Sequence, residues 1–207
     1  MKTYFIRTRR FISDLLYPSL VWEMNTSEKE MFITFDDGPS PGITEKVLDT
    51  LEAYNASATF FLIGDKAARY PEMVKEIRRR GHQTGNHTYH HLKGWNAGDD
   101  AYLDDISRTQ KLTGSNLFRP PYGKISRSQI KLLKNRYHII MWTVLSADFD
   151  VSISPEKCAE NVTANAGPGS IVVFHDSEKA SERMLHALPE TLHHFSEQGY
   201  TFKALQL

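Results

Sequence analysis

The sequence predicts a single α/β domain in which parallel β-strands curl into a barrel. From residue 31 onward, short apolar segments alternate with longer helical ones about seven times, and repeated βα units form parallel sheets. Polar motifs follow at least five predicted strands, near residues 36, 87, 119, 148 and 175. Loops from so many strand ends meet at the carboxyl-terminal rim of a barrel, whereas an open sheet concentrates function at one switch point.

In the first half of the chain, each element follows from its residue pattern. Residues 31–35 are apolar and predict a strand, and residues 41–54 predict a helix because Val47, Leu48 and Leu51 share one face. Residues 57–63 are rich in strand-forming residues. A helical pattern then runs to the breaker Gly81. These segments and those up to the middle of the chain are predicted as follows: strands at 31–35, 57–63 and 82–85, helices at 41–54, 68–81 and 100–113.

In the second half, the same alternation continues to the end of the chain. Gly114 closes the preceding helix, and Ser154 is a plausible N-cap for a later one. The segment 138–144 is continuously apolar, which is typical of a buried strand. The predicted strands are 117–119, 138–144, 169–175 and 200–205, and the predicted helices are 125–136, 154–166 and 181–199.

Composition excludes several classes of protein. The 207 residues carry 25 basic and 25 acidic side chains, so there is no overall basic field for binding nucleic acid. One cysteine, Cys158, excludes an internal disulfide framework and a multi-cysteine zinc site. No apolar run is long enough for a transmembrane helix.

The first 30 residues are interpreted as an N-terminal extension packed on a domain that spans residues 31–207. Asp14 and Pro18 interrupt the apolar residues of this basic segment, so it does not match a secretory signal, and we expect a cytoplasmic location. One apolar stripe predicts a short helix packed on the domain, with weak membrane-surface contact as the alternative. The stripe consists of Phe11, Ile12, Leu15 and Leu16.

The strongest local motif is T-F-D-D-G-P at residues 34–39, directly after a strand. The adjacent carboxylates of Asp36 and Asp37 repel each other, so one of them needs a cation or a raised pKa. A plain Asp-Gly turn is the alternative. A phosphatase that forms an aspartyl phosphate would carry its second aspartate at position 38, where this chain has Gly38.

Two histidines follow a later strand at a spacing of four residues. On a helical turn, the rings of His87 and His91 would lie on one face and could share a metal ion, although solvated surface histidines are the alternative. Together with one carboxylate they form a mixed set suited to zinc or a similar divalent ion.

Two further motifs end strands. In R-P-P-Y at residues 119–122, two prolines make the loop rigid, so that Arg119 can hold a carboxylate and the Tyr122 N–H can donate to an oxyanion. The alternative is a rigid connector with an exposed arginine. His175 leaves an apolar strand and is either a structural histidine or, beside a metal, a proton donor.

Together these motifs, in this order, resemble the polysaccharide deacetylases, the NodB-homology family also called carbohydrate esterase family four. The resemblance covers roughly residues 31–205. It implies a distorted (β/α)7-type barrel and a metal-dependent hydrolase that removes acetyl groups from N-acetylated sugars. Zinc is the expected ion, with cobalt as a substitute. The alternatives are an esterase for O-acetylated sugars and a catalytically silent, carbohydrate-binding barrel.

The resemblance also implies roles for individual residues. Asp36 is the expected base and His175 the expected acid. The metal ligands are Asp37, His87 and His91. Arg119 is expected to orient the base, Asp148 to tune Arg119, and the Tyr122 N–H to stabilise the oxyanion.

Two positions depart from the family pattern D-x-x-D-W, which aligns with residues 145–149. Leu145 replaces the first aspartate and Phe149 replaces the tryptophan of the substrate groove. We expect Trp95, Trp142 and Phe149 to stack on sugar rings. The altered groove favours short or lipid-linked glycans over an insoluble polymer.

Overall fold

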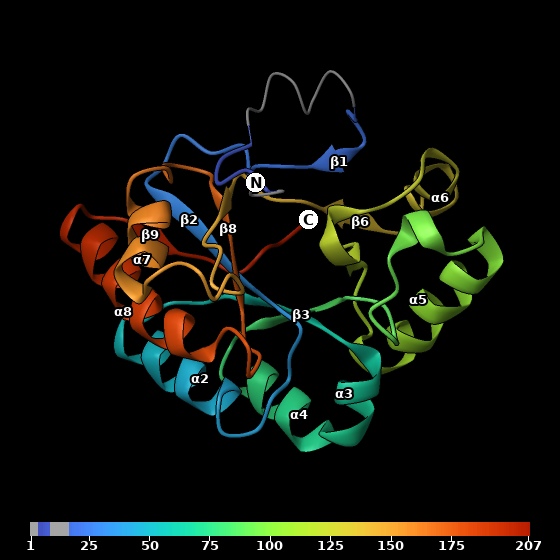
Figure 1. Cartoon of the computed structure of the whole chain (residues 1–207), viewed down its shortest axis with the longest axis horizontal. Helices are drawn as coiled ribbons and strands as arrows, with labels where there is room; N and C mark the ends of the chain where they lie inside the picture. Colours follow the sequence, from blue (N-terminus) through green and yellow to red (C-terminus); the bar gives the residue numbers. More distant parts are fainter. Residues whose placement is uncertain (1–3, 9–16) are drawn as a thin grey trace.

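A computed structural model describes residues 4–8 and 17–207 (Figure 1). The described residues form one nine-stranded sheet whose paired strands all run parallel, in the order β1-β6-β5-β4-β3-β2-β8-β7, with β9 pairing with β2 outside this path. The strands are β1 (Leu20–Val21), β2 (Glu30–Asp36), β3 (Thr59–Leu62), β4 (Gln83–Asn86), β5 (Leu117–Phe118), β6 (His138–Ile140), β7 (Val144–Leu145), β8 (Ile171–His175) and β9 (Thr201–Phe202).

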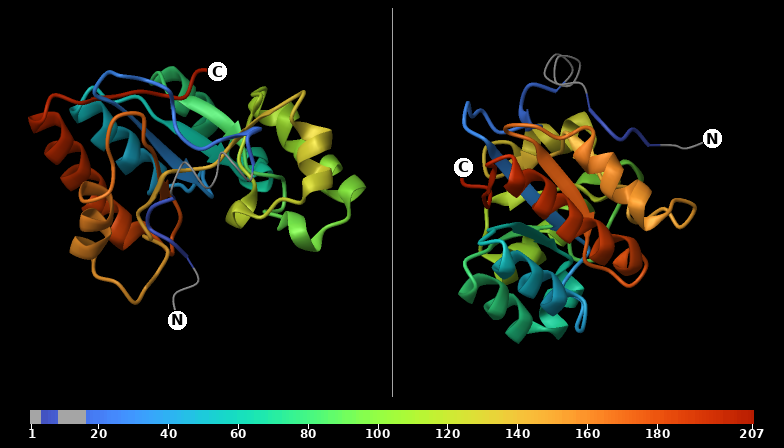
Figure 2. Two further views of the ribbon diagram at one scale, coloured as in Figure 1. Left: turned by 90° about the horizontal axis from the view of Figure 1, so that it is seen from above. Right: turned by 90° about the vertical axis from the view of Figure 1, so that its left-hand side faces the viewer.

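Helices follow most of these strands and cover the outside of the sheet (Figures 1 and 2). They are α2 (Thr44–Ala53), α3 (Gly64–Arg69), α4 (Pro71–Arg79), α5 (Asp99–Thr113), α6 (Arg127–Leu133), α7 (Pro155–Thr163) and α8 (Ser181–Glu197). Two 3₁₀ turns, η1 (Gly94–Asn96) and η2 (Pro121–Gly123), lie in the loops after β4 and β5. The predicted α/β barrel is confirmed.

The barrel is distorted because the sheet does not close between its two end strands, β1 and β7. The prediction of one continuous strand over 138–144 is wrong: β6 pairs with β5 and β1, whereas β7 pairs with β8 at the opposite end of the sheet. Residues 141–143 cross between these two places. The carbonyls of Ile140 and Met141 accept hydrogen bonds from Arg119, at 3.4 and 3.0 Å, so a buried arginine satisfies them there.

One predicted helix is two helices. The periodicity predicted a helix over 68–81, but α3 begins at Gly64 and the backbone breaks at Tyr70, where φ is −126° and ψ is 59°. The residue before a proline is disfavoured in the helical region, and Pro71 lacks the N–H that would continue α3. Pro71 is instead at the first position of α4, which suits its fixed φ.

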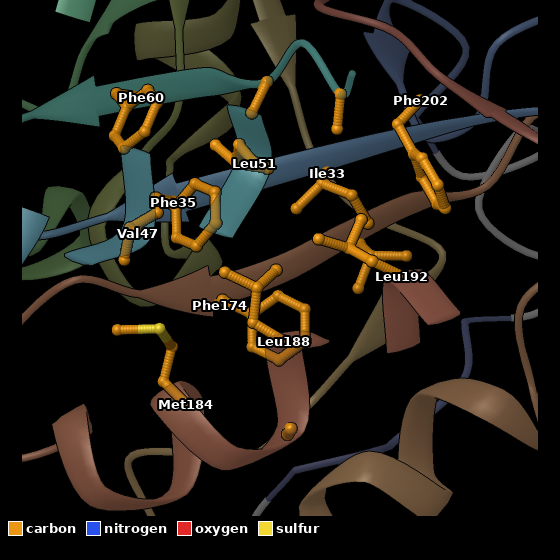
Figure 3. Packing of buried hydrophobic residues seen from close by; sticks show 14 of the residues in the cluster. Ile33, Phe35, Val47, Leu51, Phe60, Phe174, Met184, Leu188, Leu192 and Phe202 are labelled. Carbon is orange, nitrogen blue, oxygen red and sulfur yellow. The ribbon is translucent and has the colours of Figure 1, made fainter. Parts of the chain in front are cut away.

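The main core lies between the central strands and the helices outside them (Figure 3). Phe35 of β2 stacks between Phe60 of β3 and Phe174 of β8, at centroid distances of 4.8 and 6.1 Å. Helices α2 and α8 cover this row with fully buried side chains, each worth roughly 1.5–3 kcal/mol of burial. These are Val47, Leu48, Leu51, Met184, Leu188 and Leu192. The core therefore holds rigid the strand ends that carry the polar motifs.

Described parts of the first 30 residues lie along the sheet. Arg7 forms an antiparallel bridge with Val144, and Leu20 of β1 is in register with Ile139 of β6. The predicted apolar stripe from Phe11 to Leu16 lies outside the described residues. Searching the described part of the chain finds no helix with the length and apolar character needed to cross a membrane.

His82 is a buried histidine that links stability to pH. Its Nδ1 accepts the Ala58 N–H at 3.2 Å, its ring contacts Phe60 edge-on, and burial, with a smaller effect of Arg80, lowers its pKa from 6.5 to about 4. Between pH 6.5 and about 4, His82 therefore binds a proton in the unfolded chain but not in the folded chain. The contribution of neutral His82 to the free energy of unfolding is complete above pH 6.5 and is lost as pH falls toward 4.

We therefore expect the wild-type protein to lose about 2 kcal/mol more unfolding free energy between pH 7.5 and 5 than the variant His82→Gln does. Glutamine retains an acceptor for the Ala58 N–H but does not titrate. Urea unfolding at the two pH values measures the difference. Parallel losses in both proteins would contradict the assignment, since all other titrating groups are common to them.

Candidate active site

The loops at the carboxyl ends of the strands enclose a cleft of about 1410 Å³. Six of the residues predicted from the motifs line it: Asp36, Asp37, His87, His91, Tyr122 and His175. Two others, Arg119 and Asp148, lie fully buried below the lining. Segments from β2, β4, β5 and β8 thus supply one site, as expected for parallel strands that end on the same side.

The loop after β2 brings the two aspartates into the cleft. Asp36 is the last residue of β2 and is in register with His175 of β8. Asp37 adopts a left-handed backbone, with φ of 75°. The next residue must be a glycine, because a Cβ on Gly38 would lie 2.1 Å from Oδ2 of the buried Asp176. The Asp-Asp-Gly order is therefore required by packing as well as by chemistry.

Asp37, His87 and His91 form a three-residue set whose ligand atoms lie within 4.8 Å of one another. Nε2 of His91 is 3.2 Å and Nε2 of His87 is 3.7 Å from Oδ1 of Asp37. This Oδ1 is buried and accepts no hydrogen bond from any described residue. A buried carboxylate oxygen without a donor, facing two imidazole nitrogens, fits a divalent cation.

The protonation states of these residues also suit a metal site. Burial lowers the pKa of His87 to about 4, so its ring is neutral at pH 7. Its Nδ1 lies 2.8 Å from the Arg119 carbonyl, which selects the tautomer with a lone pair on Nε2. Burial alone would raise the pKa of Asp37, but the neighbouring His91 and the charges of His175 and His87 hold it well below its usual value. The carboxylate of Asp37 and the neutral imidazole of His87 thus suit a cation.

Arg119 lies buried behind the base. Its Nη1 donates to Oδ1 of Asp36 at 2.8 Å and to Thr34 Oγ1 at 2.7 Å. Its remaining nitrogens donate to the two backbone carbonyls where β6 ends, and its guanidinium lies 4.2 Å from the ring centre of Phe61. Arg119 therefore holds one oxygen of Asp36, as predicted, and leaves Oδ2 available for a proton.

Tyr122 lies at the other side of the metal ligands. Its ring packs on His91 at a centroid distance of 4.7 Å, and its backbone is left-handed, with φ of 60°. The following amides, of Gly123 and Lys124, donate to the carbonyls of Pro120 and Pro121. Within the described part of the chain, the Tyr122 N–H has no such acceptor, so it is free to bind an oxyanion.

Asp148 contacts His175 and not Arg119. It was expected to tune Arg119, but its carboxylate accepts the His175 N–H at 2.6 Å and pairs with His175 Nδ1 at 2.7 Å. Asp148 follows β7, which pairs with β8, whereas Arg119 follows β5 on the other side of the sheet. Burial alone would lower the pKa of His175, but Asp148 and more distant aspartates raise it to about 10.

Comparison with known proteins decides the family. The family model described as polysaccharide deacetylase matches residues 23–137, more than half of the chain. This chain is a polysaccharide deacetylase family member. It is 37% identical over 190 residues to a peptidoglycan-N-acetylglucosamine deacetylase of Bacillus cereus, covering 88% of this chain and 89% of the relative. It is 32% identical over 191 residues to the peptidoglycan-N-acetylmuramic acid deacetylase PdaA of Bacillus subtilis, covering 87% and 72%.

A solved structure agrees with this family. This chain superposes, with a TM-score of 0.87, on the crystal structure of a peptidoglycan N-acetylglucosamine deacetylase in complex with 4-naphthalen-1-yl-N-oxidanyl-benzamide. The two chains are 31% identical, and the match covers 93% of this chain and 95% of that one. Its family membership makes this chain a carbohydrate deacetylase, which is a hydrolase.

Two of the three aromatic residues predicted for the substrate wall lie in the lining of the cleft. Trp142 and Phe149 line the cleft, but Trp95 does not. Trp95 is 60% exposed on η1, where its Nε1 donates to the Ile125 carbonyl at 2.9 Å. In its place the N-terminal segment contributes Tyr4, whose ring meets Phe149 edge-on at 5.3 Å and whose hydroxyl donates to Asp150. The sequence did not predict Tyr4 as part of this wall, because Tyr4 and its neighbour Phe149 are far apart in the sequence.

Asp105 of α5 is a second residue that the motifs did not identify. It is buried and accepts the N–H groups of Tyr89 and His90, at 2.7 and 2.9 Å, and contacts His90 Nδ1 at 2.6 Å. These residues lie between the two histidine ligands, so Asp105 fixes the loop that carries them. A carboxylate on the buried face of a predicted helix, one residue before Ile106, was the available signal.

Proposed function

We propose that this deacetylase removes the N-acetyl group from amino sugars of peptidoglycan, with Asp36 as base, His175 as acid and one zinc ion bound by Asp37, His87 and His91. The observation that carries the proposal is the register of β2 and β8, which puts Asp36 beside His175 at the end of the two strands. The named activities of the similar Bacillus enzymes support the choice of peptidoglycan.

In the proposed hydrolysis, each of these residues has a separate role. A divalent ion held by Asp37, His87 and His91 would supply Lewis acidity, the chemistry that brings the pKa of a water toward about 7. Asp36 takes the proton from the attacking water through Oδ2, since Arg119 holds Oδ1. The Tyr122 N–H stabilises the oxyanion of the tetrahedral intermediate. His175, protonated and held at Nδ1 by Asp148, then gives a proton to the leaving amine, so that acetate and a free amino sugar are released.

Acetate release distinguishes this reaction from its alternatives. We expect the enzyme to release acetate from soluble N-acetylated peptidoglycan fragments faster than from O-acetylated xylosides. An ester leaving group needs little protonation, whereas an amine needs the acid that His175 provides. Faster release from the O-acetyl substrates would favour the esterase, and no release from either would favour a silent barrel.

Metal content gives a second test. We expect the protein purified without chelator to hold about one equivalent of zinc, because the described residues contain one three-ligand set. Chelation should abolish activity, and zinc or cobalt should restore it. The far-UV circular dichroism spectrum should not change, because the packed strands and helices form the core. Absence of metal, with no activity after its addition, would contradict the proposal.

We further propose a cytoplasmic location and short or lipid-linked glycans as substrates. The altered groove wall supports the choice of substrate: Leu145 and Phe149 line the cleft where the family pattern has aspartate and tryptophan. Fractionation of cells that express the tagged protein tests the location. Turnover of short fragments and of insoluble cell wall, measured side by side, tests the substrate length. Recovery outside the cytoplasm, with faster turnover of the polymer, would contradict both.

A further inference from the structure

The cleft of this deacetylase is more basic than the chain as a whole. Formal charges balance over the full sequence, at 25 basic and 25 acidic residues. Among the described residues that line the cleft, however, Glu178 is the single acidic one besides the catalytic-site aspartates Asp36 and Asp37. Five basic residues line the same cleft: Lys66, Arg69, Lys93, Lys124 and Lys179. The imbalance is confined to the place where substrate must bind.

Three of these residues differ from all other lysines that the structure describes. Lys66, Lys93 and Lys124 are half-buried, whereas every other lysine in the described ranges is exposed. A half-buried ammonium group loses part of its hydration, which costs free energy unless an anion compensates it. The positions of these three lysines therefore require an explanation that the fold alone does not provide.

No carboxylate among the described residues neutralises the three lysines. None of them has a carboxylate oxygen within 4.0 Å in the part of the chain that the structure describes, whereas Lys75 and Lys157 pair with glutamates at 2.7 and 2.9 Å. Lys124 lies 4.2 Å above the ring of Trp95, which orients it without cancelling its charge.

Of the three lysines, Lys66 has the most polar contacts within the protein. Its Nζ donates to Ser40 Oγ at 3.1 Å, and its charge acts at longer range on the buried Asp176. Lys93 and Lys124 have no comparable acidic neighbour in the described structure, so they carry most of the argument.

The three lysines lie on one half of the rim. They follow β3, β4 and β5, which are consecutive in the sheet, whereas Phe149 and His175 lie on the half that follows β7 and β8. The loops that carry Lys93 and Lys124 are joined, because the Gly94 N–H donates to the Lys124 carbonyl at 3.0 Å. Lys93 and Lys124 therefore lie on two loops that are held together, and they line the cleft with His91 and Tyr122.

We infer that the half of the cleft bearing Lys66, Lys93 and Lys124 binds carboxylate groups of the substrate, so that this enzyme prefers a glycan whose N-acetylated sugar carries or adjoins a carboxylate. This inference rests on the proposed function. In peptidoglycan such groups are the lactyl ether of muramic acid and the carboxylates of an attached peptide. A neutral oligomer of N-acetylglucosamine offers none, and leaves the three lysines without a counter-charge.

Matched substrates test the inference on the metal-loaded enzyme. We compare acetate release from a soluble tetrasaccharide of N-acetylglucosamine and N-acetylmuramic acid with that from the same compound after conversion of its lactyl carboxylates to amides. We expect kcat/KM to be about tenfold higher for the carboxylate form, mainly through KM, because two or three partly solvated charge contacts are lost in the amide. Raising NaCl from 50 to 500 mM should shrink the ratio, since salt screens such contacts.

Variants locate the effect. The double variant Lys93→Gln/Lys124→Gln should bring the ratio between the two substrates close to one, and Lys66→Gln should reduce it by less. The matched control is Lys131→Gln/Lys134→Gln, which removes two exposed lysines near the end of α6, away from the cleft lining, and should leave the ratio unchanged.

Each outcome has one meaning. Equal kcat/KM on the two substrates, with no gain after a peptide is attached to the lactyl group, would overturn the inference while the deacetylase function stands. The same ratio in wild type and the Lys93/Lys124 variant would overturn it too. If a gain is seen only after a peptide is attached to the lactyl group, the lysines bind the carboxylates of the peptide, which supports the inference and identifies the source. Absence of acetate from every substrate would instead overturn the proposed function.

Discussion

Replacing Asp36 with asparagine is expected to lower kcat about a thousandfold while the protein still holds its metal. The asparagine side chain retains an oxygen that accepts the Arg119 hydrogen bond, so the shape of the site is kept and only the proton acceptor is lost. General-base catalysis contributes about 10²- to 10⁴-fold, which sets the size of the loss. Acetate release under saturating substrate, with metal content measured on the same sample, provides the two readouts.

Asp37→Ala should behave differently from Asp36→Asn, because Asp37 supplies the carboxylate of the ligand set. We expect metal and activity to be lost together. A suitable control is Asp65→Asn, which changes a partly exposed aspartate of α3 whose partner is Arg69 and should affect neither readout. If Asp36→Asn emptied the site and Asp37→Ala did not, the roles of the two aspartates would be reversed.

The second large effect concerns the acid. His175→Ala should reduce turnover of N-acetyl substrates by about 10²- to 10⁴-fold, but should hardly affect an activated aryl acetate, whose leaving group departs without protonation. The ratio of the two losses is the measurement. Equal losses on amide and ester would show that His175 binds or supports the site and does not donate a proton.

The pairing of His175 with Asp148 adds a pH dependence of known sign. The acid must be protonated to act, and Asp148 contributes to raising its pKa to about 10, so activity should be retained well into the alkaline range. Asp148→Asn removes the charge but can still accept the His175 N–H. We expect the alkaline limb of the kcat profile to move to lower pH in this variant. If the alkaline limb of the kcat profile did not move in this variant, Asp148 would not contribute to the pKa of His175.

Most of the site was predictable because its residues directly follow strands. Asp36, His87 and Arg119 come at or just after strand ends, and parallel strands bring such positions together whatever the details of the fold. The partner of Asp148 was not predictable in this way. It depends on which strands are neighbours, and β7 lies beside β8 only because the apolar segment 138–144 divides into two strands.

Local sequence patterns did not predict features that depend on tertiary contacts. The break between α3 and α4 was visible at Pro71, but the start of α3 at Gly64 was not, since the predicted strand 57–63 runs up to it. The half-buried lysines of the cleft show a similar limit. Their sequence neighbours do not distinguish Lys93 or Lys124 from the exposed Lys131, and only the folded chain shows which of them lose contact with water.

The central place of β2 also constrains how the chain is made. β2 leaves the ribosome before one of its two main neighbours, β8, which is complete only at His175, after residues 37–170 have been synthesised. During that time the apolar strand Glu30–Asp36 has an open edge, which is the kind of edge to which other chains add. A nascent chain that ends before residue 171 already holds the three proposed metal ligands, Asp37, His87 and His91, and lacks the proposed acid, His175. It can therefore acquire the ion before it acquires the activity, and the ion can hold the loops after β2 and β4 together while the rest of the barrel forms.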